Sequence, residues 1–116
     1  MVDLTCQPYN SNGVHVAGTF QGNDPSTDRM YSFGNNVFEI ISYMVAGSYT
    51  YKFYNGNTGI DAETVPSGCA TSGERPINLT NDIVLSNVCF SSCGTCYPTL
   101  VNDPIFNSSV NIYPIR

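Results

Sequence analysis

Ser48-Tyr49-Thr50-Tyr51-Lys52-Phe53-Tyr54 is the stretch that decides the fold. Tyr49, Tyr51 and Phe53 occupy every second position, which is the period of a β-strand with one face in a core. The residues that follow, Asn55-Gly56-Asn57, tolerate the positive φ angles of tight turns and are expected to end the strand. This stretch therefore predicts a strand with an aromatic inner face.

Other short β-prone segments lie on both sides of this strand. We expect further strands at 2–4, 14–20, 37–44, 77–79 and 83–90. The short link Ala46-Gly47 predicts that 37–44 and 48–54 form a hairpin. No window has helical periodicity and no segment is repeated. The fold class predicted from this pattern is all-β, an immunoglobulin-like β-sandwich of about seven to eight strands with a disulfide-rich C-terminal end.

Charged residues are scarce in this chain. They make up 11% of its 116 residues, and the net charge is −5. Nucleic acid and anionic membrane surfaces bind several cations on one face, whereas the four basic residues here are scattered. No apolar run reaches the roughly 18–20 residues of a membrane span. We therefore expect no nucleic acid and no membrane insertion, and a surface suited to neutral partners such as sugars or other proteins.

The five cysteines point to an extracellular or cell-surface location, because disulfides form in oxidising compartments. They are Cys6, Cys69, Cys89, Cys93 and Cys96. We expect two disulfides among the last four, with the pairing left open and a local link within Cys93-Gly-Thr-Cys96 favoured. Cys6 is then the odd thiol, available for a link between subunits. A zinc site on the same four cysteines is the weaker alternative, so we expect no metal and no cofactor.

Catalytic patterns are missing from the sequence. His15, the single histidine, lies between two valines and is expected to face outward from a strand. Asp61 and Glu63 resemble a carboxylate pair but are expected to be solvated loop charges. With Asn55 and Asn57 they are also a candidate calcium site, since such oxygens are calcium ligands. We therefore predict that the protein is not an enzyme.

Two runs carry a family resemblance. They are Gly13-Val14-His15-Val16-Ala17-Gly18-Thr19-Phe20-Gln21-Gly22 and Ala46-Gly47-Ser48-Tyr49-Thr50-Tyr51-Lys52-Phe53. Later come Val65-Pro66 with Cys69, and Val88-Cys89-Phe90 with Cys93 and Cys96. Together, over roughly residues 2–96, the pattern resembles the glycogen- and starch-binding modules of the immunoglobulin-like early-set type in secreted Bacteroidota proteins. The resemblance implies a two-sheet sandwich and α-glucan binding.

The sugar-stacking positions of that family differ here. The family usually has a tryptophan after Phe20-Gln21-Gly22, where this chain has Asn23, and a second aromatic residue where this chain has the loop 55–59. A glycan site in this chain would therefore be a relocated one. Its candidate residues are Asn23, Tyr31, Lys52, Tyr54, Asn55 and Asn57.

The last twenty residues differ in composition from the rest. We expect a module at 1–96 and, at 97–116, a linker with a tail strand whose assembly residues are Val110, Ile112 and Tyr113. The run Ser108-Ser109-Val110-Asn111-Ile112-Tyr113-Pro114 resembles the opening of the C-terminal sorting domains of type IX secretion. Such a tail needs a sheet to pair with, either its own or that of a neighbour.

Three candidate functions follow from these patterns. The leading hypothesis is a non-catalytic extracellular structural or assembly module, a cell-surface or filament subunit whose partner is a second copy or another surface protein. The alternative is a carbohydrate-binding module for α-glucan or a related polysaccharide. A calcium-dependent adhesive role is a third.

Overall fold

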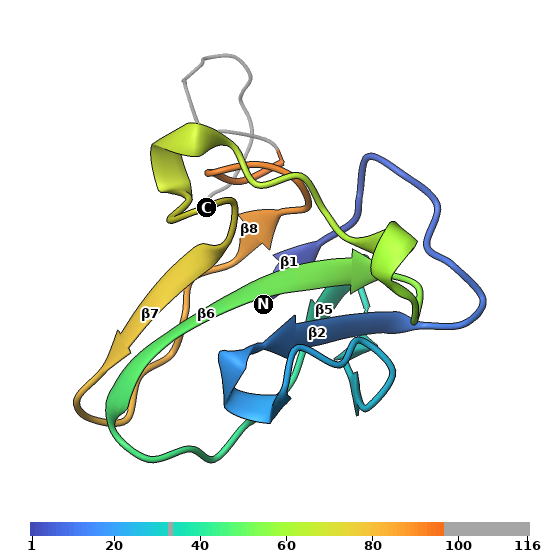
Figure 1. Cartoon of the computed structure of the whole chain (residues 1–116). Coiled ribbons are helices and arrows are strands. Elements are labelled where there is room, and N and C mark those ends of the chain that lie inside the picture. The colour runs from blue at the N-terminus through green and yellow to red at the C-terminus, as the bar shows by residue number, and fades with distance from the viewer. Residues whose placement is uncertain (33, 97–116) are drawn as a thin grey trace.

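The structure is a computed structural model that describes residues 1–32 and 34–96, and in these residues it is a two-sheet β-sandwich (Figure 1). One sheet has the strand order β4-β5-β1-β8 and the other the order β3-β2-β6-β7. The strands are β1 (Val2–Asp3), β2 (Val14–Gly18), β3 (Asp28–Arg29), β4 (Tyr31–Ser32), β5 (Val37–Glu39), β6 (Gly47–Asn55), β7 (Arg75–Leu79) and β8 (Val88–Cys89). Three short 3₁₀ turns are η1 (Thr19–Gln21), η2 (Gly59–Asp61) and η3 (Ser67–Cys69). The predicted all-β sandwich is confirmed.

Strand β6 is the centre of its sheet, because it pairs antiparallel with β2 on one edge and with β7 on the other. Phe53 is 3% exposed, and its ring lies 5.4 Å from that of Tyr51 in an edge-to-face arrangement. Tyr49, nearer the start of the strand, packs against Phe20 instead, with ring centroids 6.4 Å apart. The predicted strand and its aromatic inner face are confirmed.

The core lies between the two sheets and takes buried side chains from both. Its members are Val2, Leu4, Val14, Val16, Met30, Phe38 and Phe53. Partly buried Phe20, Ile40, Tyr51, Val88 and Phe90 pack against them. The apolar residues of the predicted strands therefore supply most of the core.

Several predicted strands are shorter than expected. β2 ends at Gly18, β5 ends at Glu39, and β8 covers only Val88–Cys89 of the predicted 83–90. β5 and β8 are short because the strand that pairs with both of them, β1, covers only Val2–Asp3. The predicted hairpin is wrong, since β5 and β6 belong to different sheets and residues 40–46 cross between them.

A buried ion pair holds the C-terminal end of the sandwich. Glu63 is 3% exposed and Arg75 is 6% exposed, and two hydrogen bonds of 2.7 Å join their side chains. The expectation that Glu63 is a solvated loop charge is wrong, because its carboxylate also accepts the backbone N–H groups of Phe53 and Ser91. This carboxylate is a structural group of the interior.

The single histidine is buried as well, contrary to the expectation of an outward-facing residue. His15 is 5% exposed, and its Nδ1 lies 2.9 Å from the backbone oxygen of Gly56. The Asn55-Gly56-Asn57 turn closes over it, and Gly56 adopts φ +135°. His15 therefore ties β2 to the end of β6.

Candidate functional site

The candidate site is an open apolar groove of about 620 Å³ between the two sheets. Its floor comes from the inner face of the β6 sheet, and its two walls come from residues 40–44 and 82–85. The floor residues are Val16, Tyr51, Phe53, Ile77 and Leu79. We call this feature the inter-sheet groove.

The inter-sheet groove lies where β1 stops. Val2 pairs antiparallel with Phe38 of β5 and parallel with Val88 of β8, so β1 separates these two strands. Both walls extend past Met1 on the side that faces away from Asp3. No described strand lies between the walls there. In the described residues, no backbone hydrogen bond joins residues 40–45 or 81–87 to another segment. Val45 O accepts the Tyr49 hydroxyl, and the other backbone groups along these walls make no hydrogen bond to another described segment.

The inner end of the groove is formed by Met1. Burial lowers the pKa of the Met1 ammonium group, and this outweighs the opposite effect of the Glu39 carboxylate. Burial likewise raises the pKa of the Tyr51 hydroxyl on the groove floor. Asn87, which is not among the groove-lining residues, has a buried side-chain oxygen with no hydrogen-bond partner among the described residues. The groove thus has an apolar floor, and burial shifts the pKa of two groups that line it, the Met1 ammonium and the Tyr51 hydroxyl.

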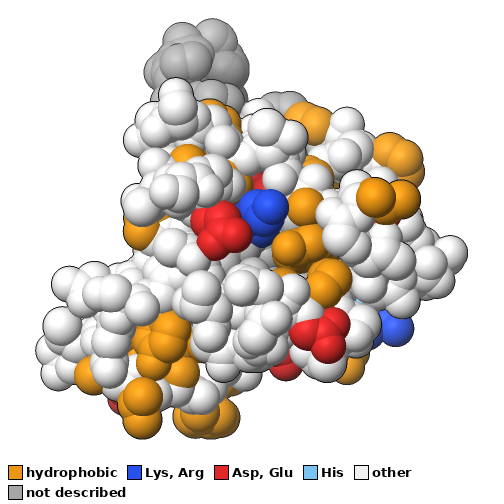
Figure 2. Space-filling view, in the orientation of Figure 1, with side chains coloured by type: hydrophobic (Ala, Val, Ile, Leu, Met, Phe, Trp, Pro, Cys, Tyr) orange, Lys and Arg blue, Asp and Glu red, His pale blue; other side chains and the backbone are white. Residues whose placement is uncertain are grey.

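The outer sides of the two walls are apolar and exposed. Ile41, Tyr43 and Val45 are 80%, 94% and 80% exposed, and Val84 is 86% exposed. Figure 2 shows hydrophobic side chains gathered at the end of the molecule where β6 begins and β7 ends. We call Ile41, Tyr43, Val45, Ile83, Val84 and Leu85 the exposed apolar row. Contiguous exposed apolar patches of this kind mark interaction sites.

The sequence of residues 37–45 carries a signal for this site, since two usable faces are expected of the strand at 37–44. Residues 37–45 are apolar on both faces, with Ile40-Ile41 and Tyr43-Met44-Val45 in succession. A strand with one solvated face alternates apolar and polar residues instead. The double-sided pattern could have indicated a segment with a partner on each side.

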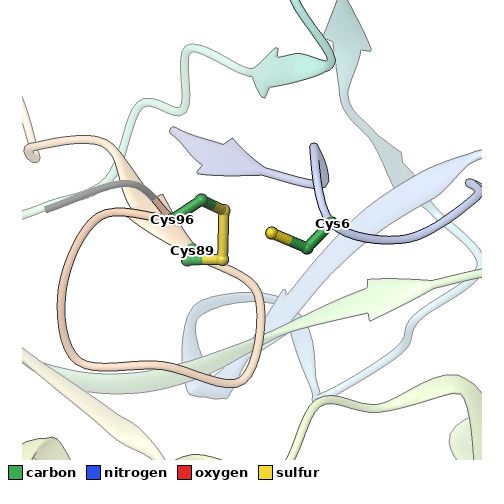
Figure 3. A group of neighbouring side chains, drawn as sticks. All are labelled: Cys6, Cys89 and Cys96. Carbon is green, nitrogen blue, oxygen red and sulfur yellow. A yellow bond between two sulfur atoms is a disulfide. The ribbon is translucent and has the colours of Figure 1, made fainter. Parts of the chain in front are cut away.

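The cysteines pair as two disulfides, Cys69–Cys93 and Cys89–Cys96. This confirms the predicted set of four, whereas the favoured local link between Cys93 and Cys96 is wrong. Cys6 is free and exposed. Figure 3 shows its sulfur facing the Cys89–Cys96 disulfide, and the three sulfur atoms lie within 4.8 Å of one another. The disulfides are typical of a protein that folds in an oxidising environment.

The candidate glycan residues do not form one platform. Tyr31 is 60% exposed on β4, whereas Lys52 and Tyr54 belong to β6 in the other sheet. The expectation of an exposed Tyr54 is wrong, since it is 7% exposed with its backbone bridged to Ala62. Its pKa is raised by burial and by nearby Glu74 and Glu63.

The amide candidates take part in loop structure. Asn23 is exposed in the left-handed conformation, with φ +58°, just after η1. The Asn55 side-chain oxygen accepts the Asn10 N–H at 2.8 Å, and Asn57 is half-buried in the same turn. These amides therefore stabilise turns where the structure places them.

The carboxylates proposed as calcium ligands are also satisfied locally. Asp61 accepts hydrogen bonds from the Thr58 hydroxyl and N–H, which lower its pKa. Asp24, a carboxylate of another loop, is satisfied in the same way by the Ser26 hydroxyl and N–H, and its pKa is lowered for the same reason. Within residues 1–32 and 34–96, the group of side chains arranged to hold a metal ion is Cys6, Cys89 and Cys96, two of which form a disulfide.

Comparisons with protein-family models, with curated proteins and with solved structures give no match to this chain. None of the described helical turns is long and apolar enough to cross a membrane. The assembly residues Val110, Ile112 and Tyr113 lie outside the described residues. The groove and the exposed apolar row are therefore the features on which a function can be argued.

Proposed function

We propose that this protein is a non-catalytic, extracellular structural and assembly module that associates with further copies of itself through the end bearing the inter-sheet groove. The observation that carries the proposal is the exposed apolar row beside an open apolar groove. Tyr43 at 94% and Val84 at 86% exposure lie on opposite walls of the groove. Partner surface that covers both walls would remove these side chains from water, which is the main driving force for association.

Composition supports the same proposal. With 11% charged residues, the chain has few charges to repel a second copy or to require desolvation at an interface. The disulfides stabilise the opposite end, at β8 and the loop of Cys69. The module is thus rigidified at one end and adhesive at the other.

The test is the concentration dependence of association, followed by sedimentation velocity and light scattering. We expect the full chain to form higher species as its concentration rises. Tyr43→Lys should shift the association midpoint at least tenfold upward, because an ammonium group in an apolar contact is costly to bury. Tyr43 is not one of the core residues and its side chain is solvated, so the variant should melt like the parent.

Ile60→Lys is the matched control. Ile60 is 95% exposed in η2, away from the groove walls. The substitution therefore removes an equally exposed apolar side chain at a different place on the surface. It should leave association unchanged. A full chain that stays monomeric at all concentrations, or equal losses in both variants, would contradict the proposal.

Carbohydrate binding is the second candidate, and one surface favours it. A shallow depression of about 580 Å³ on the β6–β7 side of the module is lined by hydroxyl groups and an amide. Its polar residues include Ser48, Thr50 and Asn78. Hydroxyls and amides in this combination suit the hydroxyls of a sugar.

Affinity electrophoresis in gels containing glycogen, amylopectin or β-glucan separates the two functions. Retardation that Asn78→Ala abolishes and Tyr31→Ala leaves intact would establish this depression as a sugar site. Unchanged mobility in every gel removes the carbohydrate-binding candidate.

A further inference from the structure

We infer that the inter-sheet groove is a strand-acceptor site and that its occupant is the C-terminal segment 108–113 of a second copy, which adds as a β-strand between residues 40–45 and 81–87. The inference rests on the proposed function and names the element through which copies associate. Such strand addition combines main-chain hydrogen bonds with pockets for alternate side chains.

The register of β1 shows which backbone groups would receive the strand. Leu4 N–H donates to Asn36 O at 3.0 Å, and Val88 N–H donates to Met1 O at 3.3 Å. Backbone groups in a strand alternate between its two edges, so even-numbered residues of both neighbours face β1. Residues 40–45 and 82–87 are not strands in the described structure, although Ser42 and Val84 both line the groove. A strand that entered the groove would have to draw these wall residues into the same alternation.

A strand in this position would pair on both of its edges. β5 is antiparallel and β8 parallel to β1, so an inserted strand of either polarity makes one antiparallel and one parallel ladder. Its inward side chains would contact Tyr51, Phe53 and Leu79 on the groove floor. The occupant must therefore have apolar residues at every second position and a free backbone on both edges.

The segment Ser108-Ser109-Val110-Asn111-Ile112-Tyr113 meets this requirement. Val110 and Ile112 share one face and are β-branched, which suits a buried strand face. The segment would span about 20 Å in extended form. Pro114 has no N–H and would end the ladder directly after it.

The origin of the tail favours a second copy over the same molecule. Cys96, the last described residue, lies beside β1 at its end remote from the groove, with its sulfur 3.5 Å from Asp3 O. The groove extends from Met1 in the opposite direction. The point where the chain leaves the described residues, at Cys96, therefore lies on the other side of β1 from the groove, an arrangement in which a head-to-tail contact can propagate. The connection 97–107 can extend roughly 35 Å, enough to reach a neighbouring copy.

The test is a complementation experiment with two full-length variants in a Cys6→Ser background, which excludes disulfide links through Cys6. Ile112→Asp damages the donor segment and leaves the groove intact. Leu79→Lys places a charge at the groove floor and leaves the donor segment intact. We expect each variant alone to be monomeric by light scattering, and their equimolar mixture to form species of twice the monomer mass. The mixture should stop there, because one functional donor and one functional groove are then used.

A second acceptor variant guards against misfolding of Leu79→Lys, and thermal melts of all variants check their folding. Val84→Pro removes one N–H from a wall residue that is 86% exposed, and it should behave as Leu79→Lys does. Hydrogen exchange should show protection of 40–45 and 81–87 on association.

Three results would overturn the inference. If Ile112→Asp associates like the parent while Tyr43→Lys does not, another element binds the apolar end, and only the proposed function survives. If the parent is monomeric and Ile112→Asp exposes residues 40–45 to exchange, the tail fills the groove of its own molecule. If no variant changes association, both the inference and the proposed function fail.

Discussion

The carboxylate of Glu63 and the guanidinium of Arg75 form a bidentate pair inside the sandwich, through two 2.7 Å hydrogen bonds. Arg75 also donates to the backbone oxygen of Ser92 at 2.8 Å and lies over the Phe53 ring, 5.4 Å from its centroid. Burial acts to lower the pKa of Arg75, but the hydrogen bonds and charge of Glu63 outweigh it and raise that pKa. The pair thus joins β6, β7 and the loop after β8 through one fully bonded network.

Glu63→Gln should destabilise the protein by about 3–5 kcal/mol, because it leaves a buried guanidinium without its counter-charge. The measurement is urea unfolding followed by circular dichroism. The double variant Glu63→Leu/Arg75→Met removes both charges. Its loss in the free energy of unfolding should therefore be smaller than the sum of the losses in Glu63→Leu and Arg75→Met. Additive losses would show that the two side chains do not act as a pair.

Gly18→Ala tests the close packing of β2 against β6. A Cβ at Gly18 would lie 2.5 Å from the Thr50 backbone oxygen and 2.9 Å from Tyr51 Cβ, and a backbone atom cannot move away cheaply. We expect a loss of about 1–3 kcal/mol in the free energy of unfolding. Gly59→Ala is the control, because its Cβ would meet nothing within 4 Å and its φ is not positive. If Gly18→Ala and Gly59→Ala were equally stable, the close approach of β2 to β6 at Gly18 would be contradicted.

Cys96→Ser should produce a Cys6–Cys89 disulfide when it is folded with oxidised glutathione, which takes up the two electrons and is released as two thiols. The three sulfur atoms lie within 4.8 Å of one another, so Cys6 can replace Cys96 with small movements. Peptide mapping after alkylation identifies the pair. In the parent, the Cys6 thiolate can attack the Cys89–Cys96 disulfide. A new S–S bond to Cys6 then forms while the Cys89–Cys96 bond breaks, and the cysteine that leaves as a thiolate takes up the proton.

A Cys6 that stays fully alkylated in Cys96→Ser would show that the sulfurs do not exchange. The earlier prediction of a link between subunits through Cys6 stays a prediction, and a non-reducing gel of the associated protein checks it.

Asp61 should titrate below the ordinary range of an aspartate. The Thr58 hydroxyl and N–H hydrogen-bond its charged form and lower its pKa, so its stabilising effect is present above the unfolded-state pKa and is lost as pH falls through the lowered folded-state pKa. Carboxyl chemical shifts against pH measure this. Thr58→Val removes the hydroxyl and should move the Asp61 pKa back upward; an unchanged pKa would leave the hydroxyl without a role.

Much of the sandwich could be predicted from local pattern. The alternation of Tyr51 and Phe53 places both rings on one face, and this depends only on the period of a strand. The cysteine composition likewise separated Cys6 from the four bonded cysteines. The positions of β1, β2 and β7 follow from β-branched residues between turn residues.

By itself, then, the sequence determined the all-β class, the main strand and the set of disulfide cysteines, because strand period and composition are local properties. Only the tertiary structure decided that residues 40–45 and 81–87 have no described strand between them, that Glu63 and His15 are buried, and which cysteines pair. These outcomes depend on which segments become neighbours across the sandwich, and pairing between distant segments leaves no signal in the period of either one.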